Sequence, residues 1–218
     1  MCKIRKFCFY CAIGALFLAS DAFPKAKSKC RGKHVVSESV NKDKTIDCQT
    51  FIQNLGNEAI EIINIQGISH DGVIEKFKNI VKKHFSINQI AKFCFGKHAR
   101  SLNKKQKEEL LRCFTNMFVK LYASSFEEYK DAHFVVTGSR EKSKNKFLIE
   151  SRITIEGKPD VVIVWDVSYR EAEKFCICDA ITNEISLRQI LQAQITGNIS
   201  EKGMKVFLAE FQEKYGKI

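Results

Sequence analysis

Proline is scarce in this chain, which has only Pro24 and Pro159 among its 218 residues. No proline-rich, low-complexity or repeated segment is present, so nothing in the sequence indicates a long linker between domains. The length and the 44% share of hydrophobic residues suit one compact domain with a sizeable core. These features predict a single globular domain that occupies most of the chain.

Signatures of catalysis and of metal binding are also missing. None of the five histidines is paired with another histidine, a cysteine or a carboxylate at the spacing of a metal site. The sequence has no glycine-rich phosphate loop, no nucleophile elbow and no pair of acids suited to general acid–base chemistry. We therefore expect no enzyme, no metal site and no cofactor.

Acidic residues are fewer than basic ones. The chain has 25 aspartates and glutamates against 36 lysines and arginines, and its net charge is +11. Such a balance is found in proteins that bind nucleic acids or anionic membranes. Here the lysines are spread along the whole chain and no nucleic-acid-binding motif accompanies them. A genome rich in A and T would produce the same excess of lysine. We expect no nucleic acid among the partners.

Cysteine, in contrast, is plentiful, with nine in the chain. An even number of cysteines would remain after loss of an N-terminal signal, which permits disulfides in an oxidising compartment. Cys94 and Cys113 fall on apolar helix faces, where free buried cysteines are common. Cys176 and Cys178 share one face of a predicted strand, a poor geometry for bridging each other, and their spacing is not that of a CxxC motif. The disulfide state stays open.

The N-terminus has the pattern of a secretory signal. Lys3, Arg5 and Lys6 precede an apolar run over residues 7–19. This run is too short to span a bilayer, which takes about 20 residues, and has the length of a signal h-region. Small residues at Ser20 and Ala22 suit a signal peptidase. Residues 1–22 are therefore predicted to be a cleaved signal peptide, with an uncleaved anchor as the alternative.

Two segments follow the predicted signal. Residues 23–47 are polar, rich in lysine and serine, and aperiodic, which predicts a disordered basic arm. Residues 48–218 form the predicted domain. It begins with apolar residues at helical spacing over residues 48–66 and 73–85, which predicts two helices. No later segment reaches the length needed to cross a membrane.

Two further helices are predicted between residues 86 and 129. Ser86 with Gln89, and Asn103 with Gln106, have the spacing of capping boxes. The second of these helices is apolar over much more than the usual stripe of about 100°, so it must be covered on two sides. Packing between other helices and a sheet explains this pattern. The alternative is that one of the two covers is a ligand.

After residue 129 the apolar period changes from 3.6 to 2. Strands are predicted near residues 134–137, 147–156, 161–167 and 174–182, and their short connections imply an antiparallel meander. Ser186 is predicted to start a helix that breaks near Gly197, and Ser200 to start the last helix. The predicted fold class is α+β, a four-stranded antiparallel sheet with helices packed against it, enclosing an apolar ligand pocket.

The middle of the chain also carries a set of residues that matches a known pattern: Ile90-Ala91-Lys92-Phe93, Gly96-Lys97-His98, Arg100, Gln106, Phe114 and Tyr122-Ala123. They resemble the MlaC, or toluene-tolerance, family of periplasmic phospholipid-binding proteins. The resemblance continues, more weakly, to about Ile195. It departs from the family at Ala99, where an aromatic residue is usual, and at Gln192, where arginine is common.

The resemblance implies a soluble periplasmic carrier for a glycerophospholipid, with the acyl chains held inside the protein. Its implied partners are an outer-membrane lipoprotein–porin complex and an inner-membrane ABC transporter complex. The alternative is an exported adaptor with a filled core, whose basic face binds a partner protein or an anionic membrane surface. The pocket candidates are large apolar residues of the middle helices and the strands: Phe95, Leu110, Phe114, Phe118, Leu121, Tyr122, Ile149, Ile153, Ile163, Trp165, Phe175 and Ile177.

We predict that the signal peptide is cleaved after Ala22 or after Ser20, because small residues follow the short apolar run there. N-terminal sequencing of the exported protein checks this prediction. A protein that keeps Met1 and sediments with membranes would contradict it.

Overall fold

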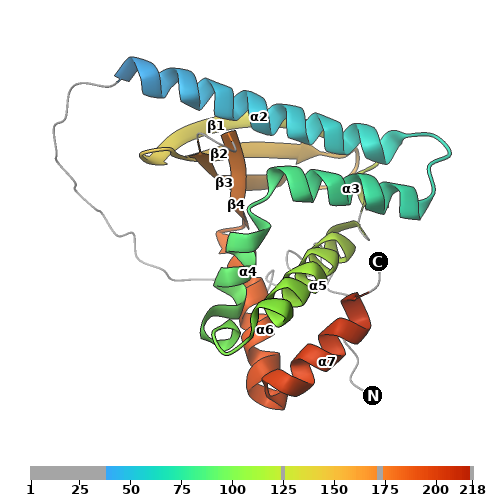
Figure 1. The fold of residues 1–218 in the computed structure, drawn as a ribbon. Coiled ribbons are helices and arrows are strands. Elements are labelled where there is room, and N and C mark those ends of the chain that lie inside the picture. Colours follow the sequence, from blue (N-terminus) through green and yellow to red (C-terminus); the bar gives the residue numbers. More distant parts are fainter. Residues whose placement is uncertain (1–37, 124–125, 171–173, 217–218) are drawn as a thin grey trace, which may run out of the picture.

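The structure is a computed structural model that describes residues 38–123, 126–170 and 174–216. The predicted signal peptide and residues 23–37 of the predicted arm lie outside these ranges. Figure 1 shows one long helix lying along the sheet and a group of helices gathered below it. In chain order the elements are α2 (Glu38–Asn64), α3 (His70–His84), α4 (Ile87–Phe95), η1 (Gly96–Ala99), α5 (Lys104–Ala123), η2 (Phe126–Tyr129), β1 (His133–Ser143), β2 (Lys146–Thr154), β3 (Val161–Arg170), β4 (Lys174–Thr182), β5 (Ile185–Ser186), α6 (Leu187–Lys202) and α7 (Met204–Tyr215).

The predicted α+β class is confirmed, with one correction to the sheet. All neighbouring strands are antiparallel and their order follows the chain, but the sheet has five strands rather than four. The fifth, β5, pairs with the end of β4 through a two-residue turn at Asn183 and Glu184. Both residues have positive φ, 51° and 63°, as the tight hairpin turn requires. Glutamate is unusual in such a turn, so Asn183-Glu184 does not predict a hairpin from the sequence.

The N-terminal helix begins earlier than predicted. Residues 38–47, expected to belong to a disordered arm, form the first turns of α2. Their polar sequence carries no apolar stripe, but Lys44 is held by tertiary contacts. Its Nζ lies 3.4 Å from Oδ1 of Asn145 and 4.7 Å from the centre of the Tyr169 ring. Contacts with the β1–β2 turn and with β3 therefore extend the helix beyond what its local sequence predicts.

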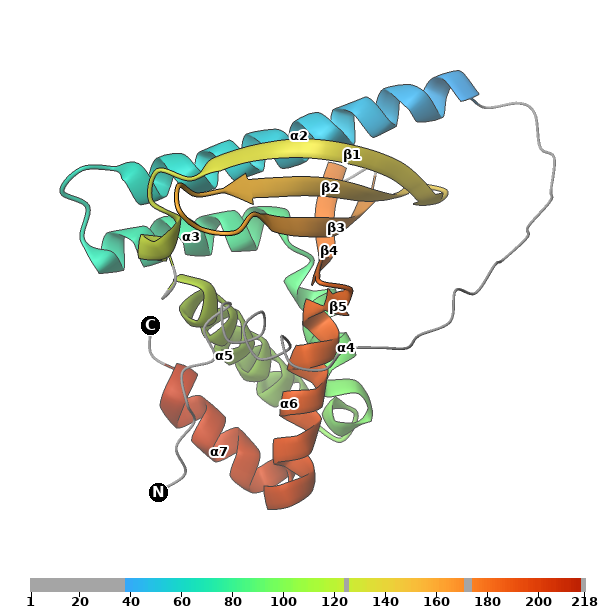
Figure 2. The same ribbon diagram turned by 180° about the vertical axis from the view of Figure 1, so that it is seen from behind.

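The edge of the sheet at β1 is covered by α2. Figure 2 shows β1 as the strand nearest that helix. The side-chain amide of Gln53 donates to the backbone carbonyl of Phe134 at 3.0 Å and accepts from the backbone N–H of Val136 at 2.9 Å. One glutamine side chain thus replaces a neighbouring strand for two backbone groups of this edge. This contact sets the height of α2 above the sheet.

Two of the four predicted helix starts, those at Asn103 and Ser186, are confirmed by their caps. Asn103 and Gln106 exchange hydrogen bonds of 2.9 and 3.0 Å between side chain and backbone. The Ser186 hydroxyl accepts from the backbone N–H of Gln189 at 3.3 Å. Ser86 makes no capping bond with its side chain, so the prediction of a capping box there is wrong. Its hydroxyl turns to the sheet instead and donates to Sγ of Cys176 at 3.0 Å.

The C-terminal helices also differ from the prediction. Helix α6 runs unbroken through Gly197, and the break falls at Gly203, whose φ of +79° suits glycine. Ser200 lies inside α6 rather than at the start of α7. A single exposed glycine weakens a helix without ending it, because its neighbours still supply the hydrogen bonds.

The buried side chains form two main clusters. One lies among α4, α5, α6 and α7 and is centred on Phe95, Phe114 and Phe118. The other lies between α2 and the inner face of the sheet and contains Ile52, Phe147 and other fully buried residues. The chain joins these clusters through α3, which contacts both. The side chains of the two clusters do not fill the space where the clusters meet.

Gly56 of α2 packs against the ring of Phe134 in β1. A Cβ atom added at Gly56 would overlap that ring. We predict that Gly56→Ala lowers the free energy of unfolding by roughly 1–3 kcal/mol, because the ring must move. Gly197→Ala is the matched control. It adds the same methyl group to a helix with no atom within 4 Å, and should raise stability by up to about 1 kcal/mol. Thermal melting measures both, and equal effects would contradict the packing described.

Candidate functional site

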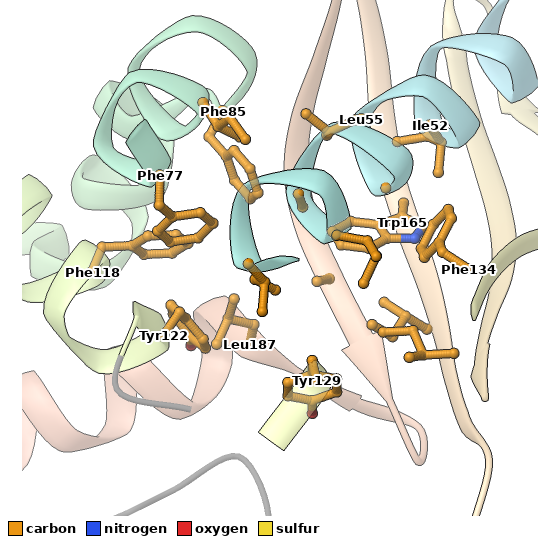
Figure 3. A pocket seen from close by; sticks show the side chains of 18 residues that line it. Ile52, Leu55, Phe77, Phe85, Phe118, Tyr122, Tyr129, Phe134, Trp165 and Leu187 are labelled. Atoms are coloured by element: carbon orange, nitrogen blue, oxygen red, sulfur yellow. The ribbon is translucent and has the colours of Figure 1, made fainter. Parts of the chain in front are cut away.

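An apolar cavity occupies the space between the two clusters (Figure 3). Its volume is about 170 Å³, counted as the positions open to the centre of a water molecule. No charged side chain lines it. The lining residues come from every layer of the fold: Ile52, Leu55, Gly56, Ala59, Ile60, Ile63, Phe77, Ile80, Phe85, Phe118, Tyr122, Tyr129, Phe134, Ile153, Ile163, Trp165, Ala180 and Leu187.

One wall is made by the helices α2 and α3. The apolar stripe of α2 continues past its contact with the sheet, so Ala59, Ile60 and Ile63 face the cavity rather than a strand. Phe77 of α3 and Phe85, which follows that helix, close the wall from the side of the helical group. The small side chain of Ala59 leaves room in this wall, whereas the space beside Gly56 is filled by the Phe134 ring. The helical period therefore produces the wall, and the small side chain of Ala59 contributes to the space.

The opposite wall is the inner face of the sheet. Trp165 of β3 is paired with Ala180 of β4 and with Ile149 of β2. Its indole Nε1–H donates to the hydroxyl of Ser151 at 2.8 Å, so the polar edge of the ring is satisfied within the sheet. The ring is left with its carbon face toward the cavity. Ile153 and Ile163 extend this apolar surface along the strands.

The end of α5 forms the third side. Phe118 is 1% exposed and packs against Phe85 and Tyr122, with ring centres 5.5 and 4.9 Å apart. Burial raises the pKa of the Tyr122 phenol, with smaller contributions from Cys94 and Asp179. The phenol is therefore neutral at every physiological pH. A cavity with such walls can hold apolar groups and offers nothing to balance a charge.

Five of the twelve pocket residues predicted from the sequence line this cavity: Phe118, Tyr122, Ile153, Ile163 and Trp165. The other seven do not. Four of them pack within the helical cluster, and the three from the strands share the inner face of the sheet with Trp165 but pack under α2. Phe95, Leu110, Phe114 and Leu121 belong to the helical cluster, and Ile149, Phe175 and Ile177 to the cluster under α2.

Sequence reasoning missed the contribution of α2 and α3. The apolar spacing over residues 48–66 and 73–85 predicts both helices, and Leu55, Ala59 and Ile63 belong to the apolar stripe of the first. The residue types of that stripe do not show whether the helix packs on a filled core or lines a cavity, because the same apolar residues occur in both situations. The small residue Ala59, in the middle of a long apolar face, is the available signal.

Two other features, a metal site and a membrane-spanning helix, are not found in the part of the chain that the structure describes. No group of three or more His, Cys, Asp or Glu side chains is placed to hold a metal ion. Among the same residues, no helix combines the length and the apolar character that crossing a membrane requires.

The fold and the cavity define a class of protein, an α+β domain whose helices enclose an apolar cavity against one face of an antiparallel sheet. The family model described as MlaC protein matches residues 53–213, and this chain belongs to the MlaC family. The resemblance found in the sequence is thereby confirmed. No curated protein matches the chain.

A solved structure shares this fold. It is the phospholipid-binding protein from Ralstonia solanacearum in complex with a phospholipid, and it superposes on this chain with a TM-score of 0.65. The match covers 78% of this chain and 98% of the other, at 14% sequence identity. At so low an identity the likeness establishes the arrangement of helices and strands.

The sheet wall of the cavity can be tested by removing the hydrogen bond between Trp165 and Ser151. We predict that Ser151→Ala lowers the free energy of unfolding by about 1–3 kcal/mol, because the buried indole N–H loses its acceptor. The tryptophan emission should change with it, since the ring is then free to turn. Ser143→Ala, at the exposed end of β1, is the matched control and should change neither quantity. Chemical unfolding followed by fluorescence measures both.

Proposed function

We propose that this protein is a periplasmic carrier for glycerophospholipids, which holds their acyl chains in the cavity described above. The observation that carries the proposal is the lining of the cavity, in which every residue is apolar or aromatic and none is charged. Acyl chains are the common cellular ligands that such walls suit. Membership of the MlaC family and a fold shared with a phospholipid-binding protein support the same assignment.

The size of the cavity indicates how such a ligand enters. A volume of about 170 Å³ is similar to the roughly 150 Å³ of a cavity that accepts benzene. Two acyl chains need more room, so the walls must separate when a phospholipid binds. The wall made by α2 and α3 is the one suited to move, because the loop at Gly67 joins these helices to each other and their side chains that line the cavity are all apolar.

The energetics of acyl chains explain why a carrier needs partners. Each buried CH₂ group contributes about 0.8 kcal/mol, so two chains approach a gross value of roughly 25 kcal/mol. A lipid held so strongly leaves slowly by itself, whether from a bilayer or from the protein. Transfer should therefore take place on membrane complexes. We propose an outer-membrane lipoprotein–porin complex and an inner-membrane ABC transporter complex as the two docking partners.

The location follows from the same proposal. A signal peptide over residues 1–22 would export the protein, and the periplasm lies between the two proposed docking partners. An exported adaptor protein was the alternative reading of the sequence. That reading requires a filled core, whereas the meeting point of the two clusters holds an apolar cavity, so the carrier is favoured.

The test is to purify the mature protein from cells and to identify bound lipid by native mass spectrometry. We predict that phospholipid is released from the wild type. Ala59→Phe places a ring in the open part of the α2 wall and should abolish lipid binding, while the melting temperature changes little because the ring enters existing space.

Ala91→Phe is the matched control for this variant. The same ring then enters the closed packing of α4, where Ala91 is 6% exposed, and should lower stability by about 1–3 kcal/mol. A wild-type protein without lipid, or an Ala59→Phe protein that retains it, would overturn the proposal.

A further inference from the structure

Two cysteines lie together on the outer face of the sheet, away from the cavity. Cys176 and Cys178 belong to β4, and the residue between them, Ile177, faces the core under α2. In an ideal strand the Cα atoms of such a pair are about 6.4–6.8 Å apart, at the upper limit for a disulfide. This spacing is why the sequence alone indicates a poor geometry for bridging.

The strand is not ideal at this point. Asp166 of β3 is paired with Asp179, but the next residue, Val167, is paired with Ile177. Cys178 is therefore the additional residue of a β-bulge. A bulge bends the strand and changes the direction of a side chain. The regular alternation that separates two neighbouring outward side chains is interrupted at Cys178.

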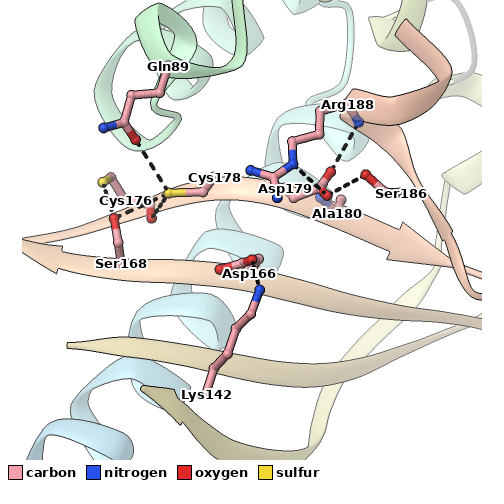
Figure 4. Close-up of polar contacts among 10 residues, drawn as sticks. All are labelled: Gln89, Lys142, Asp166, Ser168, Cys176, Cys178, Asp179, Ala180, Ser186 and Arg188. Carbon is pink, nitrogen blue, oxygen red and sulfur yellow. Dashed lines mark hydrogen bonds and ion pairs between the residues drawn. The ribbon is translucent and has the colours of Figure 1, made fainter. Parts of the chain in front are cut away.

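The two sulfur atoms share a hydrogen-bonding partner (Figure 4). The hydroxyl of Ser168, on β3, lies 3.1 Å from Sγ of Cys176 and 3.3 Å from Sγ of Cys178. Two further groups from the start of α4 complete the cluster. The Ser86 hydroxyl donates to Cys176 at 3.0 Å, and Cys178 donates to Oε1 of Gln89 at 3.8 Å. One serine oxygen thus holds the two sulfurs next to each other.

The two thiols differ in access. Cys176 is 6% exposed, whereas Cys178 is half-buried and reaches the surface. They also differ in acidity. The pKa of Cys176 is lowered, first because Cys178 donates a hydrogen bond to its thiolate, with the hydroxyls of Ser168 and Ser86 and the charge of Arg170 adding to the effect against the opposing effect of burial. The pKa of Cys178 is raised, because its thiol donates to Cys176 and is partly buried. Access lets Cys178 meet an oxidant first, and the neighbouring Cys176, whose pKa is lowered, can then attack the mixed disulfide as a thiolate.

We propose that Cys176 and Cys178 form a redox-active pair that closes to an intramolecular disulfide by exchange with a disulfide oxidant, either a small molecule or a thiol oxidoreductase. Cys178 forms a bond with one sulfur of the oxidant and transfers its proton to the sulfur that leaves. Cys176 then attacks Cys178, the second thiol of the oxidant leaves with the proton of Cys176, and the S–S bond is complete. Two protein thiols are oxidised and one disulfide is reduced to two thiols.

This proposal is independent of lipid binding, because the pair lies on the opposite face of the sheet from the cavity and the readout is the mass of a peptide. Trypsin releases both cysteines in one peptide, residues 175–188, which follows Lys174 and ends at Arg188. The mature protein is equilibrated in glutathione buffers of increasing oxidised fraction, quenched with acid, denatured, alkylated and digested. We expect this peptide to carry two alkyl groups in reducing buffer. In oxidising buffer it should carry none and be two hydrogens lighter than the unmodified dithiol.

Cys94 and Cys113 are the internal controls, since each lies in a tryptic peptide of its own. Burial raises the pKa of Cys94 to about 12 and that of Cys113 to about 11, so both should stay reduced and carry one alkyl group in every buffer. Two alkyl groups on peptide 175–188 at all ratios would overturn the proposal. So would stable glutathione adducts on it, or a bond to the peptide of Cys30.

Two variants sharpen the test. In Cys176→Ser the second exchange step is blocked, so Cys178 should retain one glutathione. Ser168→Ala removes the hydroxyl that both thiols contact in the reduced state, and should favour the disulfide by roughly two- to tenfold in the exchange equilibrium. Ser139→Ala, on the exposed part of β1, is the matched control and should leave the equilibrium unchanged. An unchanged equilibrium in Ser168→Ala would overturn the role assigned to that hydroxyl.

Discussion

The position of α2 above the sheet is the constraint on which the cavity depends. Its height is set at one place by the Gln53 amide, which is bonded to two backbone groups of β1, and by the Phe134 ring, which fits against Gly56. On one side of this contact the apolar stripe of α2 packs tightly on the strands. On the other side the same stripe lines the cavity, with Ala59, Ile60 and Ile63. A shorter α2 would no longer cover the cavity. A larger residue at position 56 would remove the contact with Phe134 that positions the helix.

Helices α4 to α7 form the helical group, which lies on the other side of the cavity from α2. Helices α4 to α7 pack around Phe95, whose ring contacts those of Phe114, Phe207 and Phe211 with centres 5.7 to 6.2 Å apart. These aromatic contacts hold the group together, while α4 and α6 contact β4 and the last turns of α5 reach the cavity. The cavity arises because two self-sufficient clusters meet at a boundary. Each cluster keeps its own close packing, although a space lies between the two. A fold of this kind can therefore have both a stable core and an apolar pocket.

Periodicity predicted most of this fold because each element carries its own pattern. The helix starts at Asn103 and Ser186 and the strand faces of β2 and β3 could be identified from neighbouring residues alone. What failed were features set by partners distant in the sequence. The first turns of α2 depend on contacts with Asn145 and Tyr169, and the strand β5 depends on a turn of unusual composition. Only part of the site was predicted, for the same reason. An apolar residue that lines a cavity and one that packs in a filled core have the same pattern in the sequence.

The strand β4 shows how one element serves two environments. Alternation places Ile177 in the core under α2 and Cys176 on the outer face, and a regular strand would continue this order to its end. The bulge at Cys178 interrupts the order, so that Cys178 and Asp179 both face outward before Ala180 returns to the cavity wall. Outward Asp179 can then accept from Ser186 at 2.5 Å and from the backbone of Arg188, which anchors the start of α6. One additional residue therefore positions the thiol pair on one face, keeps Ala180 opposite Trp165 on the other, and directs the chain into the helix that follows.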